Sequence, residues 1–126
     1  MDNAKIGEIV KAHYNSGTYI GEVIEERGKD YLIKVIAVLK HPLQGDLHNF
    51  GQTEDVFFHQ RKALSFQEKT NVSRSAVHPF NEAVPDYYVS LKQSVDALKV
   101  KLSAKESDFN KKAMKNLGDL EQQYFG

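Results

Sequence analysis

The pattern of apolar and polar positions changes at about residue 80. Before that point the apolar residues come in short runs with the period of two that is typical of β-strands. After Pro85 they recur every three or four positions, which is the period of an amphipathic helix. The change of period predicts a β-rich part over residues 1–80 and a helical part over residues 81–126. We expect the two parts to form one cooperative unit.

Short runs of β-type residues predict the strands of the first part. The three clearest runs are Ile6 to Tyr14, Thr18 to Glu25 and Tyr31 to Leu39. Asn15-Ser16-Gly17 predicts a turn in which the glycine is available for a positive φ. Weaker signals predict strands at Val56 to Phe58, Ala63 to Gln67 and Val77 to Phe80, with a 3₁₀ turn over Ser73 to Val77. Short strands, a long loop and a late one-turn helix predict a small SH3-like β-barrel.

The run from Tyr31 to Leu39 is apolar on both faces, and only Lys34 interrupts it. A strand of this kind is usually covered on both sides. One side would face the barrel interior, together with the core residues expected at Phe57, Phe58 and Phe66. The other side needs a cover, which the helical part of the chain can supply.

The helical part predicts two helices. Asp86 is a good N-cap after Pro85, and a stripe follows at Leu91, Val95, Leu98 and Leu102. The sequence from Ser103 to Glu106 fits a capping box, which predicts that the second helix begins there. Its stripe is Phe109, Ala113, Leu117, Leu120 and Tyr124. The short junction predicts an antiparallel hairpin packed on the barrel, so the fold class is α+β and mainly β.

Charge and composition narrow the function. The chain has 17 basic and 17 acidic residues, and the two signs balance on each side of residue 80. This balance argues against nucleic-acid binding, which depends on neutralising phosphates. The absence of cysteine excludes disulfides, thiolate nucleophiles, cysteine zinc sites and lipid attachment through a cysteine. No stretch approaches the roughly 20 apolar residues of a membrane span, and the first residues lack a secretory signal. We expect a cytoplasmic protein that reaches the inner membrane face only through a partner.

The sequence specifies no reaction. His41, Asp46, His48 and His59 have the side-chain types of a metal site, but their spacing fixes no ligand geometry, and we interpret them as polar loop residues that satisfy backbone groups and solvate the surface. Asp46 beside Gly45 is read as a turn rather than as a catalytic carboxylate. No phosphate-binding loop, nucleophile motif or zinc-protease motif is present. We therefore predict no catalytic residue, no cofactor and no metal, and the chain is not expected to be an enzyme.

Residues 40–55 form a long stretch with little periodicity, and loops of this length are often functional. The predicted partner-binding residues are His41, Pro42, Leu43, Gln44, Gly45, Asp46, Leu47 and His48. Leu43 and Leu47 would serve as anchors in the pocket of a partner. The alternative is that both leucines fold back and plug the mouth of the barrel.

Five segments of the chain carry a resemblance to a known family: GEIVKAHYNSGTYIGEV, AVLKHPLQGDLH, FFHQRKAL, VPDYYVSLK and LEQQYFG. The chain resembles the kinase-associated protein B (KapB) family of endospore-forming bacilli over almost its whole length. The resemblance implies an SH3-like barrel with a C-terminal helical pair. It also implies an accessory role, in which the protein supports the membrane sensor histidine kinase KinB that feeds the sporulation phosphorelay. The family name often includes the word lipoprotein, whereas this chain has no cysteine to carry lipid.

Two other functions remain open at this point, a nucleic-acid-binding small barrel and a metal-dependent enzyme that uses histidine and aspartate. The sequence also leaves the oligomeric state open, including a homodimer.

Overall fold

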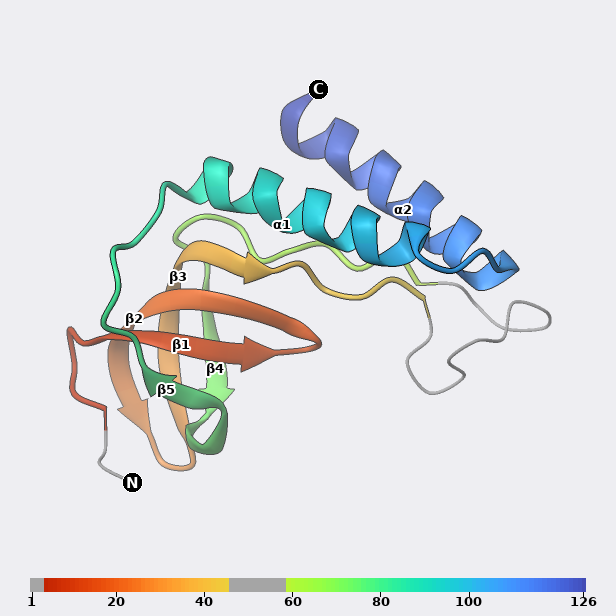
Figure 1. Cartoon of the computed structure of the whole chain (residues 1–126). Coiled ribbons are helices and arrows are strands. Elements are labelled where there is room, and N and C mark those ends of the chain that lie inside the picture. The colour runs from red at the N-terminus through yellow and green to blue at the C-terminus, as the bar shows by residue number, and fades with distance from the viewer. Residues whose placement is uncertain (1–3, 46–58) are drawn as a thin grey trace.

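The computed structural model describes residues 4–45 and 59–126, and Figure 1 shows the order of the elements. The strands are β1 (Ile9–Tyr14), β2 (Gly17–Arg27), β3 (Asp30–Lys40), β4 (Lys69–Ser73) and β5 (Val77–Pro79). A 3₁₀ turn at Arg74–Ala76 precedes β5, and the helices are α1 (Tyr87–Ser103) and α2 (Asp108–Phe125). The strand predicted at Val56 to Phe58, with its two expected core phenylalanines, lies outside the described residues.

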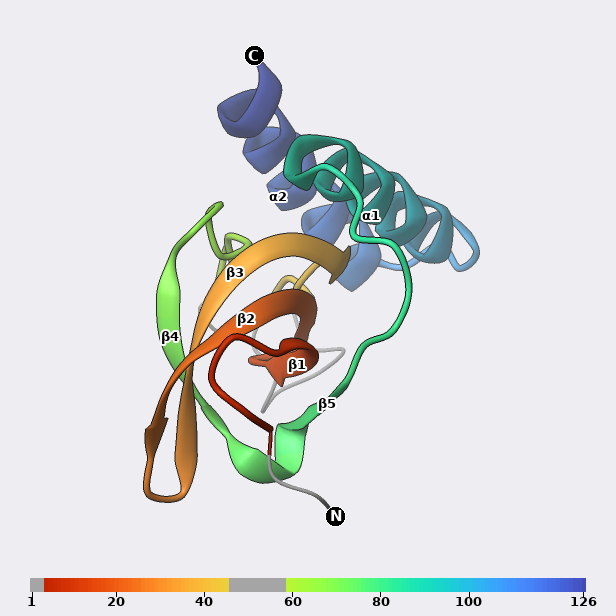
Figure 2. The same cartoon turned by 90° about the vertical axis from the view of Figure 1, so that its left-hand side faces the viewer.

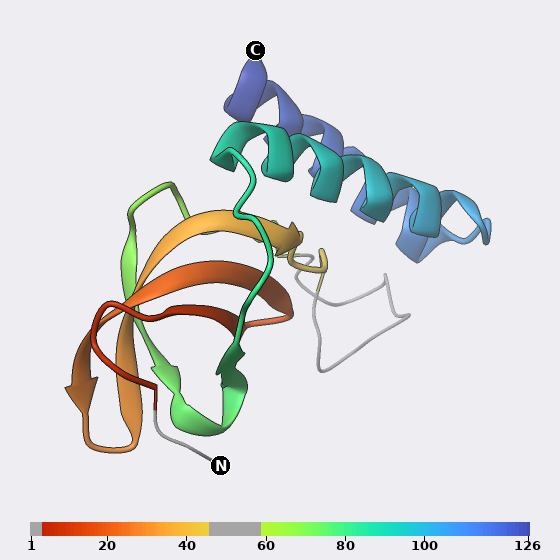
Figure 3. The same cartoon turned by 60° about the vertical axis from the view of Figure 1, so that its left-hand side comes forward.

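The strands form one antiparallel, strongly curved sheet in the order β4-β3-β2-β1-β5. Figures 2 and 3 show this sheet curled on itself, with the helical hairpin on one side of it. Helix α1 lies next to β3, and α2 lies beyond α1. The predicted fold class, a small SH3-like barrel with an antiparallel helical hairpin, is confirmed.

The first hairpin turn differs from the prediction in one detail. Asn15 and Ser16 take the positive φ angles, 46° and 65°, whereas Gly17 is the first residue of β2 and pairs with Tyr14. Positive φ at both residues is the conformation of a two-residue hairpin loop of type I′. Gly17 is required for space instead, because a Cβ there would lie 2.7 Å from the Tyr19 hydroxyl.

The fourth strand lies later in the chain than the sequence predicts. Residues 63–67 form no strand, and β4 covers Lys69–Ser73. Phe66, predicted to be a core residue, is in a turn before β4 and is 46% exposed. The strand was missed because β4 lies at the edge of the sheet and buries only Val72, which leaves little hydrophobic pattern.

The buried side chains form two separate clusters. The barrel interior contains Ala4, Val10, Ala12, Val23, Tyr31, Ile33, Val72 and Val77. The layer between the barrel and the helices contains Tyr19, Val35, Val38, Ala63, Tyr87, Leu91, Val95, Leu98 and Leu117. Strand β3 contributes residues to both clusters, so the helices cover the sheet as the two apolar faces of this strand predicted.

One predicted apolar face of β3 is interrupted by irregular pairing with β2. Ile20 and Gly21 of β2 pair with Ala37 and Val35, so Ile36 is unpaired in a β-bulge. The pairing of β2 with β3 shifts again next to Leu39, which is exposed. The expected face through Tyr31, Ile33, Val35, Ala37 and Leu39 is therefore not continuous: Tyr31 and Ile33 belong to the barrel interior, Val35 belongs to the layer with the helices, and Leu39 is exposed.

The capping of α1 follows the prediction, and that of α2 does not. The Asp86 carboxylate accepts a hydrogen bond from the Val89 amide at 3.1 Å. Ser103, expected to open the second helix, is the last residue of α1, and its hydroxyl donates to the Lys99 carbonyl. The N-cap of α2 is Ser107, whose hydroxyl accepts from the Asn110 amide at 3.0 Å. A capping-box pattern depends only on neighbouring residues. It could not show that α1 continues to Ser103, where the preceding residue Leu102 packs against the core.

Ser107→Ala is expected to lower the free energy of unfolding by about 1 kcal/mol, because one N-terminal amide of α2 loses its acceptor. The matched control is Ser103→Ala, which removes the same hydroxyl from the exposed end of α1 and is expected to change stability by less than about 0.5 kcal/mol. Urea denaturation of both variants measures the difference. Equal effects at the two positions would contradict the assignment.

Candidate functional site

The two segments that flank the undescribed residues run side by side beneath the helices (Figure 1). The Gln44 side chain joins them, because its amide nitrogen donates to the Arg61 carbonyl at 2.9 Å and its oxygen accepts from the Arg61 amide at 2.9 Å. The Gly45 amide also donates to the His59 carbonyl at 2.8 Å. Gln44 is buried, and its two hydrogen bonds link the segments as a backbone pair links two neighbouring strands.

His41 connects the first segment to the end of α2. Its Nδ1 lies 2.9 Å from the Pro42 carbonyl, and its Nε2 lies 2.9 Å from the Tyr124 hydroxyl. The Pro42 carbonyl can only accept, so the geometry assigns the ring proton to Nδ1, and Tyr124 donates to Nε2. Burial of the ring lowers the pKa of His41, although the bond to the Pro42 carbonyl opposes this shift. His41 is therefore neutral in the folded protein at neutral pH.

The lowered pKa of His41 predicts a loss of stability in mild acid. In the unfolded chain the ring titrates at its ordinary value of 6.5, so its contribution is complete above that pH and is lost as the pH falls below it toward the folded-state pKa. The slope from one such group reaches at most about 1.4 kcal/mol per pH unit. Denaturation between neutral and mildly acidic pH should show a flatter slope in His41→Gln than in the wild type.

The matched control is His59→Gln, which makes the same substitution at an exposed histidine outside the buried network. An unchanged slope in His41→Gln would mean that other groups, such as His13, dominate the acid response. The pKa of His13 is also lowered, mainly by burial and then by His78.

Three tyrosine hydroxyls from three different elements hold residues 63 and 64. Tyr124 of α2 accepts from the Ala63 amide at 2.9 Å, and Tyr19 of β2 accepts from the Leu64 amide at 3.3 Å. Tyr87 of α1 donates to the Leu64 carbonyl. Burial raises the pKa of all three phenols, that of Tyr19 to about 12. The phenols stay protonated at physiological pH and serve as fixed donors and acceptors for this short stretch of backbone.

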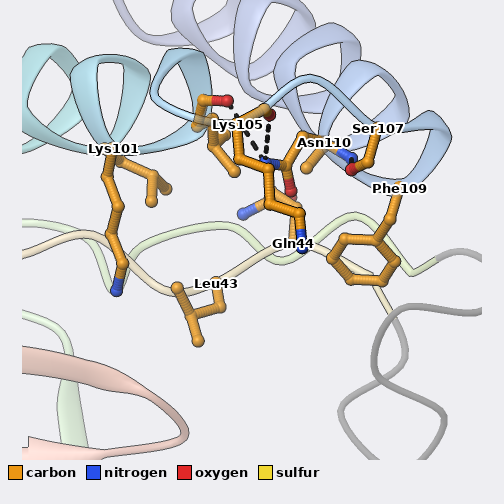
Figure 4. Close-up of a pocket in the computed structure, with 10 residues that line it drawn as sticks. Leu43, Gln44, Lys101, Lys105, Ser107, Phe109 and Asn110 are labelled. Atoms are coloured by element: carbon orange, nitrogen blue, oxygen red, sulfur yellow. Dashed lines mark hydrogen bonds between the residues drawn. The ribbon is translucent and has the colours of Figure 1, made fainter.

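A cavity of about 320 Å³ opens beside these anchored segments, at the end of the hairpin where α1 turns into α2 (Figure 4). Its lining is mainly apolar and consists of Leu43, Gln44, Leu98, Lys101, Leu102, Lys105, Ser107, Phe109, Asn110 and Ala113. The Asn110 side chain donates to the carbonyls of Leu102 and Lys105 and so fixes the turn above the cavity. The walls come from α1, α2 and the segment after β3, and these three are held together by the core and by the contacts of Gln44 and His41.

The two lysines at this cavity differ from Lys92 and Lys99 of α1. Lys92 and Lys99 of α1 both pair with Glu121 of α2, and Lys92 also pairs with Asp96. These lysines lower the pKa of the Glu121 carboxyl. Lys101 and Lys105 have no ion-pair partner among the described residues, and no carboxylate belongs to the described lining. Within the described residues, the cavity therefore has an apolar interior and two lysines without an ion-pair partner.

The predicted partner-binding residues divide into two groups. His41, Pro42, Gln44 and Gly45 are buried, and Leu43 is half-buried against the helical core while it lines the cavity. The Leu43 amide is bonded to the Ser16 hydroxyl. Asp46, Leu47 and His48 lie outside the described residues.

The sequence did not identify Lys101 and Lys105 as residues of a candidate site, because the helical part contains many lysines at similar spacings. Their positions on both sides of Leu102, the last residue of the predicted α1 stripe, were the available signal. In the structure Tyr87 is buried and Tyr88 is exposed, as expected for adjacent tyrosines in a first helical turn.

The histidine and aspartate set considered for a metal is not brought together in the described part of the chain. Within residues 4–45 and 59–126 no three histidine or acidic side chains are grouped so that they could hold a metal ion. Both ring nitrogens of His41 are already bonded within the protein, and Asp46 and His48 lie outside the described residues. The same part of the chain contains no helix that is both long and apolar enough to cross a bilayer.

The fold and this site define a small SH3-like barrel with a helical hairpin, held together by polar contacts through the segment after β3. The sequence model of the kinase-associated protein B family matches residues 14–125. A protein named kinase-associated lipoprotein B, from Bacillus subtilis (strain 168), is 44% identical over 125 residues, which cover 99% of this chain and 98% of that protein. The crystal structure of kinase-associated protein B from Bacillus cereus is similar, with a TM-score of 0.82 and 35% identity over 96% of this chain and 97% of the other.

The chain belongs to the kinase-associated protein B family, as its sequence segments predicted.

Proposed function

We propose that this protein is a non-catalytic accessory protein that binds a sensor histidine kinase of the KinB type and supports its input into the sporulation phosphorelay. The name of the family and of the similar Bacillus subtilis protein, kinase-associated, supports a kinase as the partner. The proposed contact consists of the predicted partner-binding residues 41–48 and the adjoining cavity, which Leu43 and Gln44 line. In this proposal the protein is cytoplasmic and reaches the inner membrane face through the kinase.

One observation carries the choice of this face. Apart from Lys101 and Lys105, the described residues next to the cavity use their polar groups within the protein, as Gln44 does with Arg61 and Asn110 with the turn above it. These groups build a rigid wall and are not available to a small substrate. A preformed, mainly apolar hollow with rigid walls suits the insertion of a side chain from another protein, because little conformational entropy is lost on binding.

The direct test is binding between this protein and the purified cytosolic region of a KinB-type kinase, measured by isothermal titration calorimetry. We expect saturable binding with a negative change in heat capacity, because apolar surface is buried. The cytosolic region of a second sensor kinase from the same cell is the specificity control. Failure to bind the first kinase, or equal binding of both, would contradict the proposal.

The consequence for the cell is tested by capture from membranes of sporulating cells, with the tagged protein as bait. The proposal expects the KinB-type kinase among the retained proteins, identified by mass spectrometry. Its absence, in a capture in which the bait is folded, would contradict a membrane role through this partner.

A further inference from the structure

We infer that the cavity at the end of the hairpin accepts a bulky apolar side chain from an acidic segment of the partner, whose carboxylates pair with Lys101 and Lys105. This inference rests on the proposed function, since it names the part of the kinase that the cavity recognises. It adds a chemical description of the partner, which the family name does not contain.

The walls of the cavity suit an apolar side chain. Leu98 and Leu102 of α1, Phe109 and Ala113 of α2 and Leu43 of the segment after β3 supply most of the surface of the cavity. Its volume of about 320 Å³ is at the lower end of the range of roughly 300–1,000 Å³ that holds small ligands. A site of this size has room for one large apolar or aromatic side chain. Residues of that kind provide most of the binding energy at protein interfaces when a pocket encloses them.

The two lysines at the cavity suit carboxylates on the partner segment. Figure 4 shows that Lys101 extends from α1 toward the segment at Leu43 and that Lys105 ends near Gln44, so both flank the cavity. The other lysines of α1, Lys92 and Lys99, form ion pairs with Glu121 of the protein itself. The whole chain is electrically neutral, so the positive charge of Lys101 and Lys105 is a local feature of the described cavity lining. Carboxylates on both sides of an inserted apolar residue would compensate it.

The same observations favour a peptide segment over a nucleic acid. Nucleic-acid binding draws its affinity from the neutralisation of many phosphates along a groove. Two lysines at an apolar cavity on a neutral protein provide few such contacts, whereas they match a short acidic segment with an apolar anchor. A peptide that contains acidic residues around one leucine or phenylalanine is the simplest ligand of this type.

The first experiment reverses the two charges. Lys101→Glu/Lys105→Glu should weaken binding of the kinase cytosolic region by about tenfold or more, since like charges then face each other across the interface. Lys101→Arg/Lys105→Arg should keep the affinity. The matched control is Lys29→Glu/Lys115→Glu, which changes the net charge equally at exposed lysines outside the cavity lining and should bind as the wild type does. Unchanged melting midpoints verify that all variants are folded.

The second experiment identifies the segment with synthetic peptides that tile the kinase cytosolic region, measured by fluorescence anisotropy. The tightest peptide should contain an apolar residue flanked by Asp or Glu, and changing that residue to alanine should abolish its binding. Duplex DNA of mixed sequence should not compete with this peptide.

The outcomes separate the two proposals. If the wild-type protein does not bind the kinase, the proposed function is wrong and this inference falls with it. If the wild type binds and Lys101→Glu/Lys105→Glu binds as tightly as the control double variant, the kinase contact stands and the inference about the cavity is wrong. A preference for basic peptides, or displacement of the acidic peptide by DNA, would also overturn it.

Discussion

Leu117→Ala is expected to lower the free energy of unfolding by about 2–5 kcal/mol, the range for removing a fully buried leucine. Leu117 of α2 is completely buried in the layer between the helices and the barrel, together with Leu91, Val95 and Leu98 of α1. Its removal leaves a cavity that the surrounding side chains can fill only in part. Urea denaturation followed by circular dichroism measures the loss.

The control for this change is Val100→Ala on α1. Val100 is 73% exposed, so its truncation is expected to change stability by less than about 0.5 kcal/mol. A similar small effect at Leu117 would mean that the hairpin does not depend on this packing.

The Leu117 variant also tests whether the barrel and the hairpin form one cooperative unit, which is a prediction from the sequence. Hydrogen exchange of the β2 amides reports on the barrel, and circular dichroism reports mainly on the helices. If the parts unfold together, both signals should shift to the same new midpoint. A barrel that keeps its protection while the helices melt would show two independent domains.

Tyr124→Phe is expected to destabilise the protein by about 1–3 kcal/mol, because it leaves buried polar groups without partners. The Tyr124 hydroxyl accepts from the Ala63 amide and donates to His41 Nε2. Phenylalanine preserves the packing of the ring and removes only these two bonds. Urea denaturation gives the free energy, and hydrogen exchange of the Ala63 amide should become faster.

The control is Tyr88→Phe, which removes the hydroxyl from a tyrosine that is 56% exposed in the first turn of α1. Its stability is expected to stay within about 0.5 kcal/mol of the wild type, since water replaces the lost contacts. Loss of stability at Tyr88 equal to that at Tyr124 would show that the His41 network contributes nothing specific.

The parts of the fold that depend on local periodicity were predictable from the sequence. The stripe of α1, its Asp86 cap and the stripe of α2 lie where the hydrophobic pattern placed them. The start of α2 and the position of β4 were not predictable, because a second serine four residues later caps the helix and the edge strand buries one residue. Phe66 was misplaced for a related reason, since an aromatic residue in a turn can pack on Tyr87 and still be exposed.

The candidate site was less predictable than the fold. The sequence identified the loop after the third strand, but it gave no reason to connect His41 with Tyr124, which are 83 positions apart. The cavity needs three segments that meet only in the folded chain, and nothing in the sequence distinguishes its two lysines from the other lysines. Such features are set by tertiary packing, which no local pattern records.

The Ser90 hydroxyl of α1 prevents a further strand from adding to one edge of the sheet. Strand β4 pairs with β3 only from Asp30 to Lys34, and further along the strand the Val38 amide donates to the Ser90 hydroxyl at 3.0 Å. The helix thus occupies the edge on which an incoming strand would form its ladder, and an uncovered edge of this kind promotes aggregation. Partners that extend a sheet by adding a strand are therefore excluded from this edge of β3, and recognition there must rely on side chains.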